Sequence, residues 1–399
     1  MQLGPDLHLA YCTNIHRGDD WSETLASLEK YTLAVRERVS PDRPYAIGLR
    51  LSDLASRKLS EPRTLDQFRR WLDTHDCYVF TINGFPFGQF HGSRVKEQVY
   101  RPDWSHPDRL GYTNRLFDLL AQLVPEGVEG SVSTLPGSFK EFITTDEQRA
   151  QIREHLWQCI DHIERCAARN GRKLHLGLEP EPLGLFETSA ETVRFFEEMQ
   201  AHRPGDVRLT KFLGVNYDTC HLAVEYEEPS AAITALQAAG IRLSKIHLSS
   251  ALQLAPDADA RAWLRRFADD TYLHQVVART ADGTLRRDRD LDVALAQPPG
   301  DSEWRIHFHV PLHATTLAHG QTTAAHLLGV LDLLAKQPSL CSHLEMETYT
   351  WEVLPAELRA ASVVEQLVRE YEWTLAELRT RGLWRASEKE RSPWPDVLG

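Results

Sequence analysis

The sequence lacks the features of a membrane protein, a secreted protein or a nucleic-acid binder. No segment of its 399 residues is apolar over the length of a membrane span, and the start, MQLGPDLHLAYC, has no basic stretch followed by a long apolar one. Basic residues are too few for a dedicated nucleic-acid binder, because 45 Lys and Arg stand against 57 Asp and Glu and leave a net charge of −12. We therefore predict a cytoplasmic protein with no membrane insertion and no nucleic-acid partner.

Cysteine is scarce as well. The six cysteines form no CxxC pair, so we expect reduced and mostly buried thiols. Hydrophobic residues make up 42% of the chain and charged residues 26%, which is typical of a globular protein in water. The length suits one large α/β barrel with insertions, or two ordinary domains.

Five short segments share one apolar face and one polar face that ends in Glu, Asp or His. They are LGLEPEP (176–182), NYDTCHL (216–222), KIHLSSA (245–251), RIHFHVP (305–311) and HLEMETY (343–349). Side chains alternate between the two faces of a strand, so Leu176 and Leu178 share one face while Glu179 and Glu181 take the other. Charged strand ends that recur this often predict a barrel, covered by helices, with a site where the strands finish.

Strand-like and helix-like segments alternate along most of the chain, which predicts parallel strands joined by right-handed crossovers. We predict a single (β/α)₈ TIM barrel in residues 1–385, with RIHFHVP as extra material between the seventh and eighth strands. Residues 251–304 break the alternation and contain Asp282-Gly283, a pair typical of hairpin turns. This segment is predicted to be an inserted subdomain or lid before the last strand, and 386–399 to be a loosely held tail.

Four of the strand ends offer a set of metal ligands. Glu179, Asp218, His247 and Glu347 supply three carboxylates and one imidazole, which suit Mn²⁺, Co²⁺, Zn²⁺, Mg²⁺ or Fe²⁺ better than a thiolate site would. Such an ion would polarise a carbonyl or hydroxyl group of a bound polyol. The alternative is that Glu179 and Glu347 are structural ion-pair partners in the barrel mouth.

Further polar residues near the strand ends are candidates for a second metal ion or for substrate contacts. They are Glu181, His221, Glu345, His307 and His309. Glu345 lies one pleat deeper than Glu347, which favours a buried acid that supports the ligands. For His221, and for at least one of His307 and His309, an ordinary hydrogen-bonded structural role is a comparable alternative.

A third group of residues could bind the substrate. It consists of Asn14, His16, Arg50, Asn83, His91, Lys245 and Arg305. By strand parity Arg50, Lys245 and Arg305 would point inward, where they would bind a phosphate or carboxylate or neutralise buried glutamates. The loop that contains Phe85, Phe87 and Phe90 is either a cap over the substrate or a hydrophobic plug.

The ordered set of Glu, Asp-x-x-His, His and Glu resembles the xylose-isomerase-like TIM barrel superfamily of sugar isomerases, ketose 3-epimerases, inosose-type dehydratases and endonuclease IV enzymes. More narrowly, the chain resembles the EboE family of metabolite-traffic proteins from Tyr11 to about Pro355. The matching stretches are YCTNIH, NGFPFGQFHG, VKEQVYRPDW, LEPEP, YDTCHLAVEYE, LSSAL, HFHVPL and LEMETYTWEVLP. In the ketose epimerases that this chain resembles, one glutamate removes a proton from the substrate and the other returns one on the opposite face. The resemblance implies these roles for Glu179 and Glu347.

The resemblance implies a metal-dependent isomerase, epimerase or dehydratase that acts on a sugar or a cyclitol-like polyol. One alternative is a non-catalytic carrier of a small polar metabolite, although a carrier needs no acid/base pair. The other is a phosphoesterase or nuclease of endonuclease IV type, whose early strands carry histidine ligands. Here Arg50 and Asn83 hold the comparable positions, which speaks against a nuclease. A small polar metabolite is the expected partner, and an oligomer is compatible with the sequence.

Overall fold

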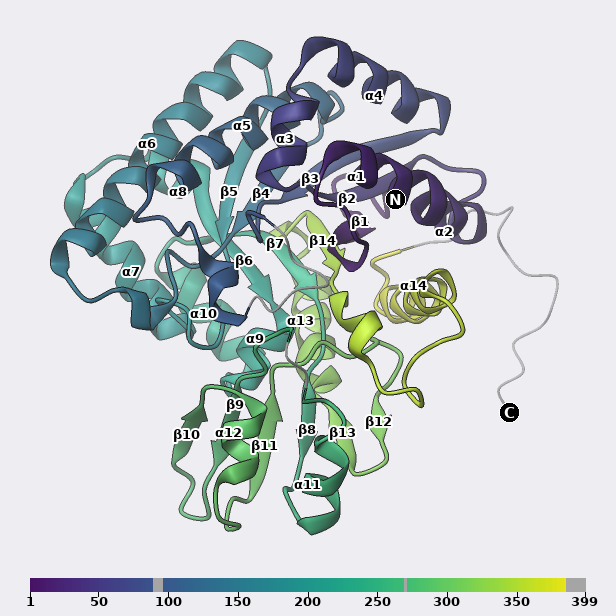
Figure 1. Ribbon diagram of the computed structural model, residues 1–399. Helices are drawn as coiled ribbons and strands as arrows, with labels where there is room; N and C mark the ends of the chain where they lie inside the picture. Colours follow the sequence, from purple (N-terminus) through teal and green to yellow (C-terminus); the bar gives the residue numbers. More distant parts are fainter. Residues whose placement is uncertain (89–95, 269–270, 385–399) are drawn as a thin grey trace.

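Eight parallel strands form a nearly closed barrel with helices around its outside, as the sequence predicted (Figure 1). The computed structural model describes residues 1–88, 96–268 and 271–384. In sheet order the strands are β1 (His8–Tyr11), β14 (His343–Met346), β7 (Arg242–Leu248), β6 (Leu213–Asp218), β5 (Leu174–Leu178), β4 (Gly130–Thr134), β3 (Cys77–Asn83) and β2 (Tyr45–Arg50). The predicted tail, 386–399, lies outside the described residues, as do Phe90 and His91.

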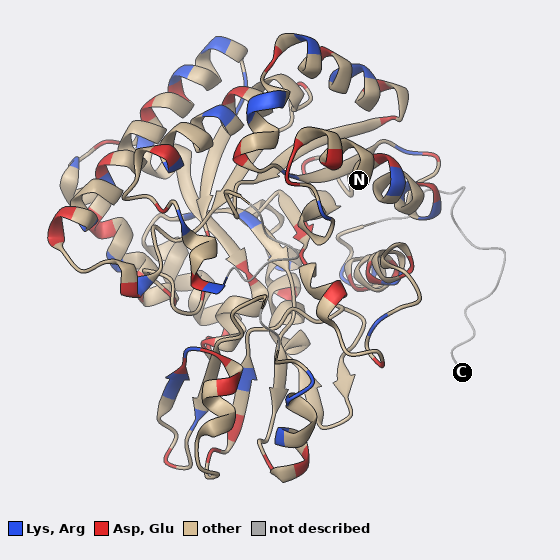
Figure 2. Ribbon diagram, viewed as in Figure 1, with Lys and Arg blue, Asp and Glu red and all other residues tan. Residues whose placement is uncertain are grey.

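The outer layer is helical. It comprises α1 (Trp21–Ser27), α2 (Leu33–Val39), α3 (Asp53–Leu59), α4 (Pro62–Thr74), α5 (Pro107–Leu123), α6 (Asp146–Asn170), α7 (Ser189–His202), α8 (Arg208–Phe212), α9 (Thr219–Val224), α10 (Pro229–Ala238), α13 (Ala324–Lys336) and α14 (Val363–Thr380). Figure 2 shows acidic and basic residues interspersed along these helices. Within the described part of the chain, no helix combines the length and the apolar character that a membrane crossing requires.

The longest helix shows how the sequence determines an element. The Thr145 side chain accepts a hydrogen bond from the backbone of Gln148, and the Gln148 side chain accepts one from the backbone of Thr145, so both ends of a capping box are present. Gly171 follows the helix with a φ of +61°, a conformation that favours glycine. These two signals define the start of α6 at Asp146 and its end at Asn170.

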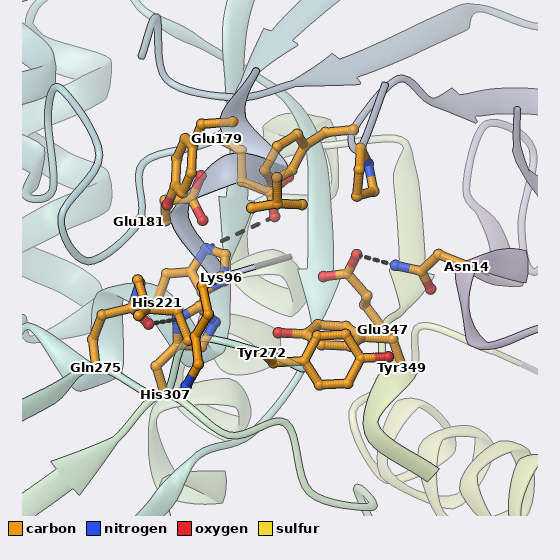
Figure 3. Close-up of a pocket in the computed structure, with 15 residues that line it drawn as sticks. Asn14, Lys96, Glu179, Glu181, His221, Tyr272, Gln275, His307, Glu347 and Tyr349 are labelled. Carbon is orange, nitrogen blue, oxygen red and sulfur yellow. Dashed lines mark hydrogen bonds and ion pairs between the residues drawn. The ribbon is translucent and has the colours of Figure 1, made fainter. Parts of the chain in front are cut away.

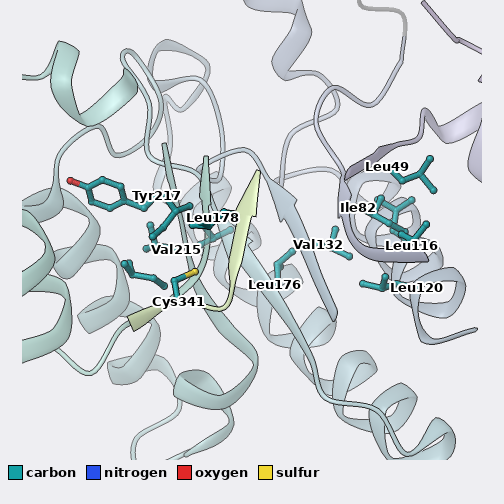
Figure 4. Packing of buried hydrophobic residues seen from close by; sticks show 14 of the residues in the cluster. Leu49, Ile82, Leu116, Leu120, Val132, Leu176, Leu178, Val215, Tyr217 and Cys341 are labelled. Atoms are coloured by element: carbon teal, nitrogen blue, oxygen red, sulfur yellow. The ribbon is translucent and has the colours of Figure 1, made fainter. Parts of the chain in front are cut away.

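The strands place their apolar side chains under the helices. Leu176, Leu178, Val215 and Tyr217 are fully buried on the outward face of β5 and β6 (Figure 4). Burying a leucine side chain stabilises a fold by about 1.5–3 kcal/mol. The same alternation turns the polar residues of each strand toward the barrel axis, and this is the reason why the sequence pattern positions a site.

The barrel closes at one narrow seam. Among the described residues, β1 and β2 share a single isolated bridge, between Cys12 and Gly48. A side chain at residue 48 would collide with the Glu345 carboxylate and with the Tyr11 carbonyl. Glycine at this position therefore leaves the space inside the barrel in which Glu345 lies.

A second sheet lies between β7 and β14 in the sequence and below the barrel in Figure 1. Its six antiparallel strands are β8 (Leu252–Leu254), β9 (Val276–Arg279), β10 (Leu285–Asp288), β11 (Glu303–Ile306), β12 (Thr316–Leu317) and β13 (Gly320–Thr322), with α11 (Ala258–Leu264) and α12 (Leu291–Ala296) beside them. The hairpin between β9 and β10 contains Asp282 and Gly283, where φ is +87°. This sheet, which we call the insertion, continues past residue 304 to Thr322 and has its own apolar core around Trp304 and Phe308.

One aromatic ring joins the insertion to the barrel. Tyr226, which follows α9 with a φ of +61°, has the guanidinium groups of Arg279 and Arg305 at 4.3 and 4.1 Å from its ring centre. Arg305 also donates a hydrogen bond to the Ala223 carbonyl at 2.7 Å. Cation–π contacts of this kind contribute about 0.5–2 kcal/mol each.

A buried acid in α14 should make stability depend on pH. Burial raises the pKa of Glu370 to about 8, although its carboxylate accepts a hydrogen bond from Thr348 at 2.7 Å. Because the folded state favours the neutral acid, this group's contribution to stability falls as pH rises from about 4.5 to about 8 and is constant above that. Glu370→Gln stays neutral, so its melting temperature relative to the wild type should rise over this range and then level off. A difference that does not change with pH would contradict this expectation.

Candidate active site

The four predicted metal ligands meet where β5, β6, β7 and β14 end. Each of Glu179, Asp218, His247 and Glu347 offers one atom, and these atoms all lie within 4.8 Å of one another. All four side chains are buried. The strands are parallel, so their carboxyl ends form one rim of the barrel and bring together residues that are up to 168 positions apart in sequence.

His247 lies at the centre of this set. Its Nδ1 is 2.9 Å from Glu179 Oε1, 3.2 Å from Glu347 Oε2 and 3.6 Å from Asp218 Oδ2. Burial alone would lower the pKa of His247, but the negative charges of Glu347 and Glu179 outweigh it and raise the pKa well above its usual value. The nitrogen that faces the three carboxylates therefore carries a proton when no other cation is present.

The neighbours of His247 fix its ring. Its Nε2 is 2.8 Å from Glu345 Oε2, and Glu345 also forms an ion pair with Lys245 inside the barrel. Burial would raise the pKa of Glu345, but Lys245 and His247 lower it to about 2. A carboxylate behind an imidazole is the arrangement that orients metal-binding histidines. The deeper position of Glu345, anticipated from strand parity, thus gives it contact with His247 on the side away from the other carboxylates.

Asp218 is held by the helix that follows it. Its Oδ1 accepts hydrogen bonds from the backbone of Cys220 and His221 at 2.7 and 2.9 Å, and from Ser249 Oγ at 2.6 Å. Its Oδ2 is buried and makes no hydrogen bond within the described residues. Burial would raise the pKa of Asp218, but His221 and His247 hold it well below its usual range. The second carboxylate oxygen, Oδ2, is therefore negatively charged and available as a metal ligand at the centre of the four-residue set.

These observations fit a divalent cation. Three carboxylates converge on one imidazole nitrogen, one buried carboxylate oxygen has no hydrogen bond, and the opposite ring nitrogen is already engaged. A cation bound here would replace the proton on His247 Nδ1, as metal binding generally displaces protons from its ligands. Oxygen and imidazole donors suit Mn²⁺, Co²⁺, Zn²⁺, Fe²⁺ or Mg²⁺.

A second set of donors adjoins the first. His221 Nδ1 lies 3.2 Å from the Pro180 carbonyl, and His309 Nδ1 lies 2.7 Å from the Glu347 carbonyl. Carbonyl oxygens only accept, so Nδ1 carries the hydrogen in each ring and the two Nε2 atoms, 3.4 Å apart, face each other. With Asp218 they form a group whose ligand atoms lie within 4.8 Å. A shared proton or a second cation would satisfy both nitrogens.

A pocket lies over these residues, between the barrel mouth and the insertion (Figure 3). It is lined by Asn14, Glu179, Glu181, His221, Glu347 and Tyr349 from the barrel, by Phe85, Pro86, Lys96, Val99 and Tyr100 from the segment after β3, and by Tyr272, Leu273, Gln275 and His307 from the insertion. Lys96 forms an ion pair with Asp290 at 2.5 Å, which links the segment after β3 to the insertion. The pocket is thus walled by three separate parts of the chain.

The acids that line the pocket are held differently. Glu347 Oε1 accepts hydrogen bonds from Asn14 at 2.8 Å and Asn83 at 3.2 Å, and Figure 3 places Glu347 and Asn14 across the pocket from Glu179 and Glu181. Burial would raise the pKa of Glu347, but His247 lowers it below its usual value. Burial and the charge of Glu179 raise the pKa of Glu181 well above its usual range. Two ionisable groups in one pocket are thereby shifted in opposite directions.

The cationic candidates do not reach the pocket. Arg50 donates hydrogen bonds to the carbonyls of Gly18 and Gly88, and Lys245 is bound to Glu345 and Ser133 inside the barrel. Arg305 lies on Tyr226 instead. RIHFHVP begins in β11, an inner strand of the insertion that pairs with β8 and β9 and ends at Ile306, so the alternation assumed from the sequence does not aim this side chain at the barrel axis.

The remaining candidates divide between the pocket and its surroundings. Asn14 lines the pocket, whereas Asn83 contacts Glu347 from behind. His16 stacks on Tyr31 with ring centres 4.6 Å apart and hydrogen-bonds to Tyr11, away from the pocket. Phe85 lines the pocket, and Phe87 packs on Tyr112.

Sequence reasoning missed several residues that line the pocket. They are Lys96, Val99, Tyr100, Tyr272, Leu273, Gln275 and Tyr349. None lies at the polar end of a barrel strand. Lys96, Val99 and Tyr100 belong to VKEQVYRPDW and Tyr349 belongs to LEMETYTWEVLP, and these two stretches of the family resemblance were the available signals. Tyr272, Leu273 and Gln275 lie outside such stretches.

Comparison with known proteins shows the fold. No family model matches the chain, and no curated protein matches it. The solved structure of an L-ribulose 3-epimerase superposes with a TM-score of 0.52 at 13% identity, covering 94% of this chain and 96% of that one. The D-psicose 3-epimerase of Clostridium cellulolyticum H10, solved with D-tagatose, gives a TM-score of 0.51 at 12% identity over 94% and 99% of the two chains. The chain therefore shares the TIM barrel fold of these two structures.

Removing one of the four predicted ligands should abolish metal binding. Wild-type protein purified without chelator or affinity tag is expected to contain about one or two equivalents of a divalent metal, and Asp218→Ala to lose it, because the variant lacks the carboxylate that faces His247. Elemental analysis by mass spectrometry measures this. Asp332→Ala, which removes a surface carboxylate bound to Arg381, is the matched control and should keep the metal. Equal metal content in all three proteins would contradict the assignment.

Proposed function

We propose that this protein is a cytoplasmic, divalent-metal-dependent isomerase or epimerase of a sugar or cyclitol-like polyol, with dehydration as the related reaction of the same site. The observation that carries the proposal is the pair of carboxylates, Glu179 and Glu347, on opposite sides of one pocket and in one metal-binding set (Figure 3). A binder has no need of two such groups. The fold that the chain shares with two ketose 3-epimerases supports the proposal.

The lining of the pocket suits an uncharged polyol. Carboxylates, imidazoles and amides offer partners for hydroxyl groups, while Phe85, Tyr272 and Tyr349 cover the site with aromatic surface. The three cations predicted from strand parity are bound elsewhere, and Lys96, which does line the pocket, is paired with Asp290. Such a pocket favours hydroxyl groups over a phosphate group.

The chemistry assigned to the pair is proton removal and return. A divalent ion on Glu179, Asp218, His247 and Glu347 would supply a Lewis acid that makes the hydrogen next to a substrate carbonyl more acidic. One carboxylate of the pair removes that proton. The other, after taking up a proton from water, delivers it to the opposite face of the same carbon, which inverts it. Asn14 and Asn83 orient Glu347 for this step, and the low pKa of Glu347 keeps it ionised as a base must be.

The narrower assignment is to the EboE family of metabolite-traffic proteins, with a step in the biosynthesis or traffic of a small polar metabolite. It is supported by the stretches that resemble this family, which include most of the residues of the site. LEPEP carries Glu179 and Glu181, YDTCHLAVEYE carries Asp218 and His221, and LEMETYTWEVLP carries Glu347.

A second candidate is hydrolysis of a phosphate ester by two metal ions. The adjacent group of Asp218, His221 and His309 favours it, because such reactions use paired ions. The absence of Arg50, Lys245 and Arg305 from the pocket lining speaks against it. Cleavage of bis(p-nitrophenyl) phosphate by metal-loaded protein would support this candidate, and no cleavage with Mn²⁺ or Zn²⁺ would remove it.

Neutralising either carboxylate should stop turnover. Glu179→Gln and Glu347→Gln are each expected to lower kcat by at least ~10²–10⁴-fold, since each removes a proton-transfer group. The measurement is conversion of a panel of ketoses and cyclitol ketones by metal-loaded protein, with deuterium uptake from heavy water at the inverted carbon. Glu365→Gln, on the outer face of α14 beside Arg38, should retain wild-type activity. Turnover unaffected by both site variants refutes the assignment, and binding of a polyol without conversion would favour a carrier.

A further inference from the structure

Gln275 connects the insertion to the segment that carries the site's acids. It lies just before β9 and is almost completely buried. Its side-chain Nε2 donates a hydrogen bond to the Pro182 carbonyl at 3.2 Å, and its Oε1 lies 2.7 Å from His307 Nδ1. The His307 backbone also donates to the Gln275 carbonyl at 2.8 Å. Pro182 directly follows Glu181, so one amide spans from the end of β5 to the insertion.

These contacts fix the hydrogen on the His307 ring. The Pro182 carbonyl can only accept, so the NH₂ group of Gln275 must face it and the amide oxygen must face His307. That oxygen also only accepts, so His307 Nδ1 carries the ring hydrogen. A neutral imidazole has one such hydrogen, and His307 Nε2 is therefore left as a bare acceptor.

The ring that carries the bare nitrogen lines the pocket. His307 is buried and lines the pocket, and within the described residues its Nε2 has no hydrogen-bond partner. Figure 3 places Gln275 and His307 on the wall opposite Glu347 and Asn14. A buried acceptor without a donor destabilises the site, and a ligand that brings a donor would remove this cost.

We propose that Gln275 is a positioning residue, which presents His307 Nε2 to the pocket as the acceptor for one hydroxyl group of the polyol bound between Glu179 and Glu347. This inference rests on the proposed function and adds a specificity element from the insertion. His309 does not compete for this role, because its Nε2 faces His221 at 3.4 Å. A substrate that lacks a hydroxyl group at this position leaves the acceptor unpaired and is discriminated against.

The position of the hydrogen on the His307 ring can be observed directly by NMR. The measurement uses Zn²⁺-loaded protein labelled with ¹⁵N in its histidine rings, and the His307 signals are assigned by their loss in His307→Gln. In the wild type, the Nδ1 chemical shift of His307 should be pyrrole-type and its Nε2 chemical shift should be pyridine-type. In Gln275→Leu the fixed tautomer should be lost, and both shifts should move toward each other. Saturation with D-tagatose, used as the ketose probe, should move the Nε2 resonance of the wild type toward the pyrrole-type range.

Kinetics and binding give the second measurement. Gln275→Leu should raise KM for the converted ketose, or the Kd for D-tagatose by calorimetry, about tenfold, as expected for the loss of one hydrogen bond to a buried group, while kcat changes less. His307→Gln, which places a carbonyl oxygen near the position of Nε2, should retain more affinity than His307→Leu. The matched control is Gln253→Leu, which breaks a 2.9 Å hydrogen bond to Glu303 in the same sheet and should leave affinity unchanged.

Any of the following results would overturn the inference about Gln275 and His307. A wild-type His307 ring with its hydrogen on Nε2 removes the role of Gln275. A shift of Nε2 on titration with Zn²⁺, with none on saturation with D-tagatose, makes His307 a metal ligand instead of a hydroxyl acceptor. Binding of D-tagatose without any such shift leaves the proposed function standing and overturns the role of His307 alone. If D-tagatose and every other ketose or cyclitol ketone of the panel fail to bind, the proposed function fails together with the inference.

Discussion

The barrel mouth is organised around the His247 imidazole, which has carboxylates next to both of its nitrogen atoms. Glu345 contacts His247 Nε2 from inside the barrel, and Glu179, Asp218 and Glu347 surround Nδ1 from the rim. Four buried acids in so small a volume would repel one another, and the positive charges of Lys245 and of protonated His247 make their burial possible. The positions of Asn14, Asn83 and Ser249 follow from this need, because each donates a hydrogen bond to a carboxylate of the set.

The second constraint is the insertion. A bare barrel rim would expose the ligands to water, whereas here Tyr272, Gln275 and His307 wall the pocket from the other side. Two kinds of side-chain contact attach the insertion to the rest of the protein. The Tyr226 ring contacts the guanidinium groups of Arg279 and Arg305, and Lys96 forms an ion pair with Asp290. The site therefore combines a rigid parallel rim, which holds the acids, with an antiparallel sheet that supplies further polar groups.

The sequence predicted the part of the structure that depends on local rules. Alternation along β5, β6, β7 and β14 separated the core from the rim, and parallel strands bring their ends together, so the fold was confirmed and the four ligands were found in one cluster. The same rule misplaced Arg305, because β11 belongs to another sheet and ends at Ile306. Gln275 could not be found from the sequence, since its place in the pocket depends on how distant segments fold back. His91 lies outside the described residues.

The narrow seam of the barrel has a consequence for mutational tolerance. Gly48 touches no ligand and lies on a strand on which the site does not directly depend, yet any side chain there would meet the Glu345 carboxylate that orients His247. Substitutions of Gly48 are therefore expected to impair the site as substitutions of the site residues do, although Gly48 lies outside the pocket lining. In this fold, the geometry of the site depends on one residue whose role is to occupy no space.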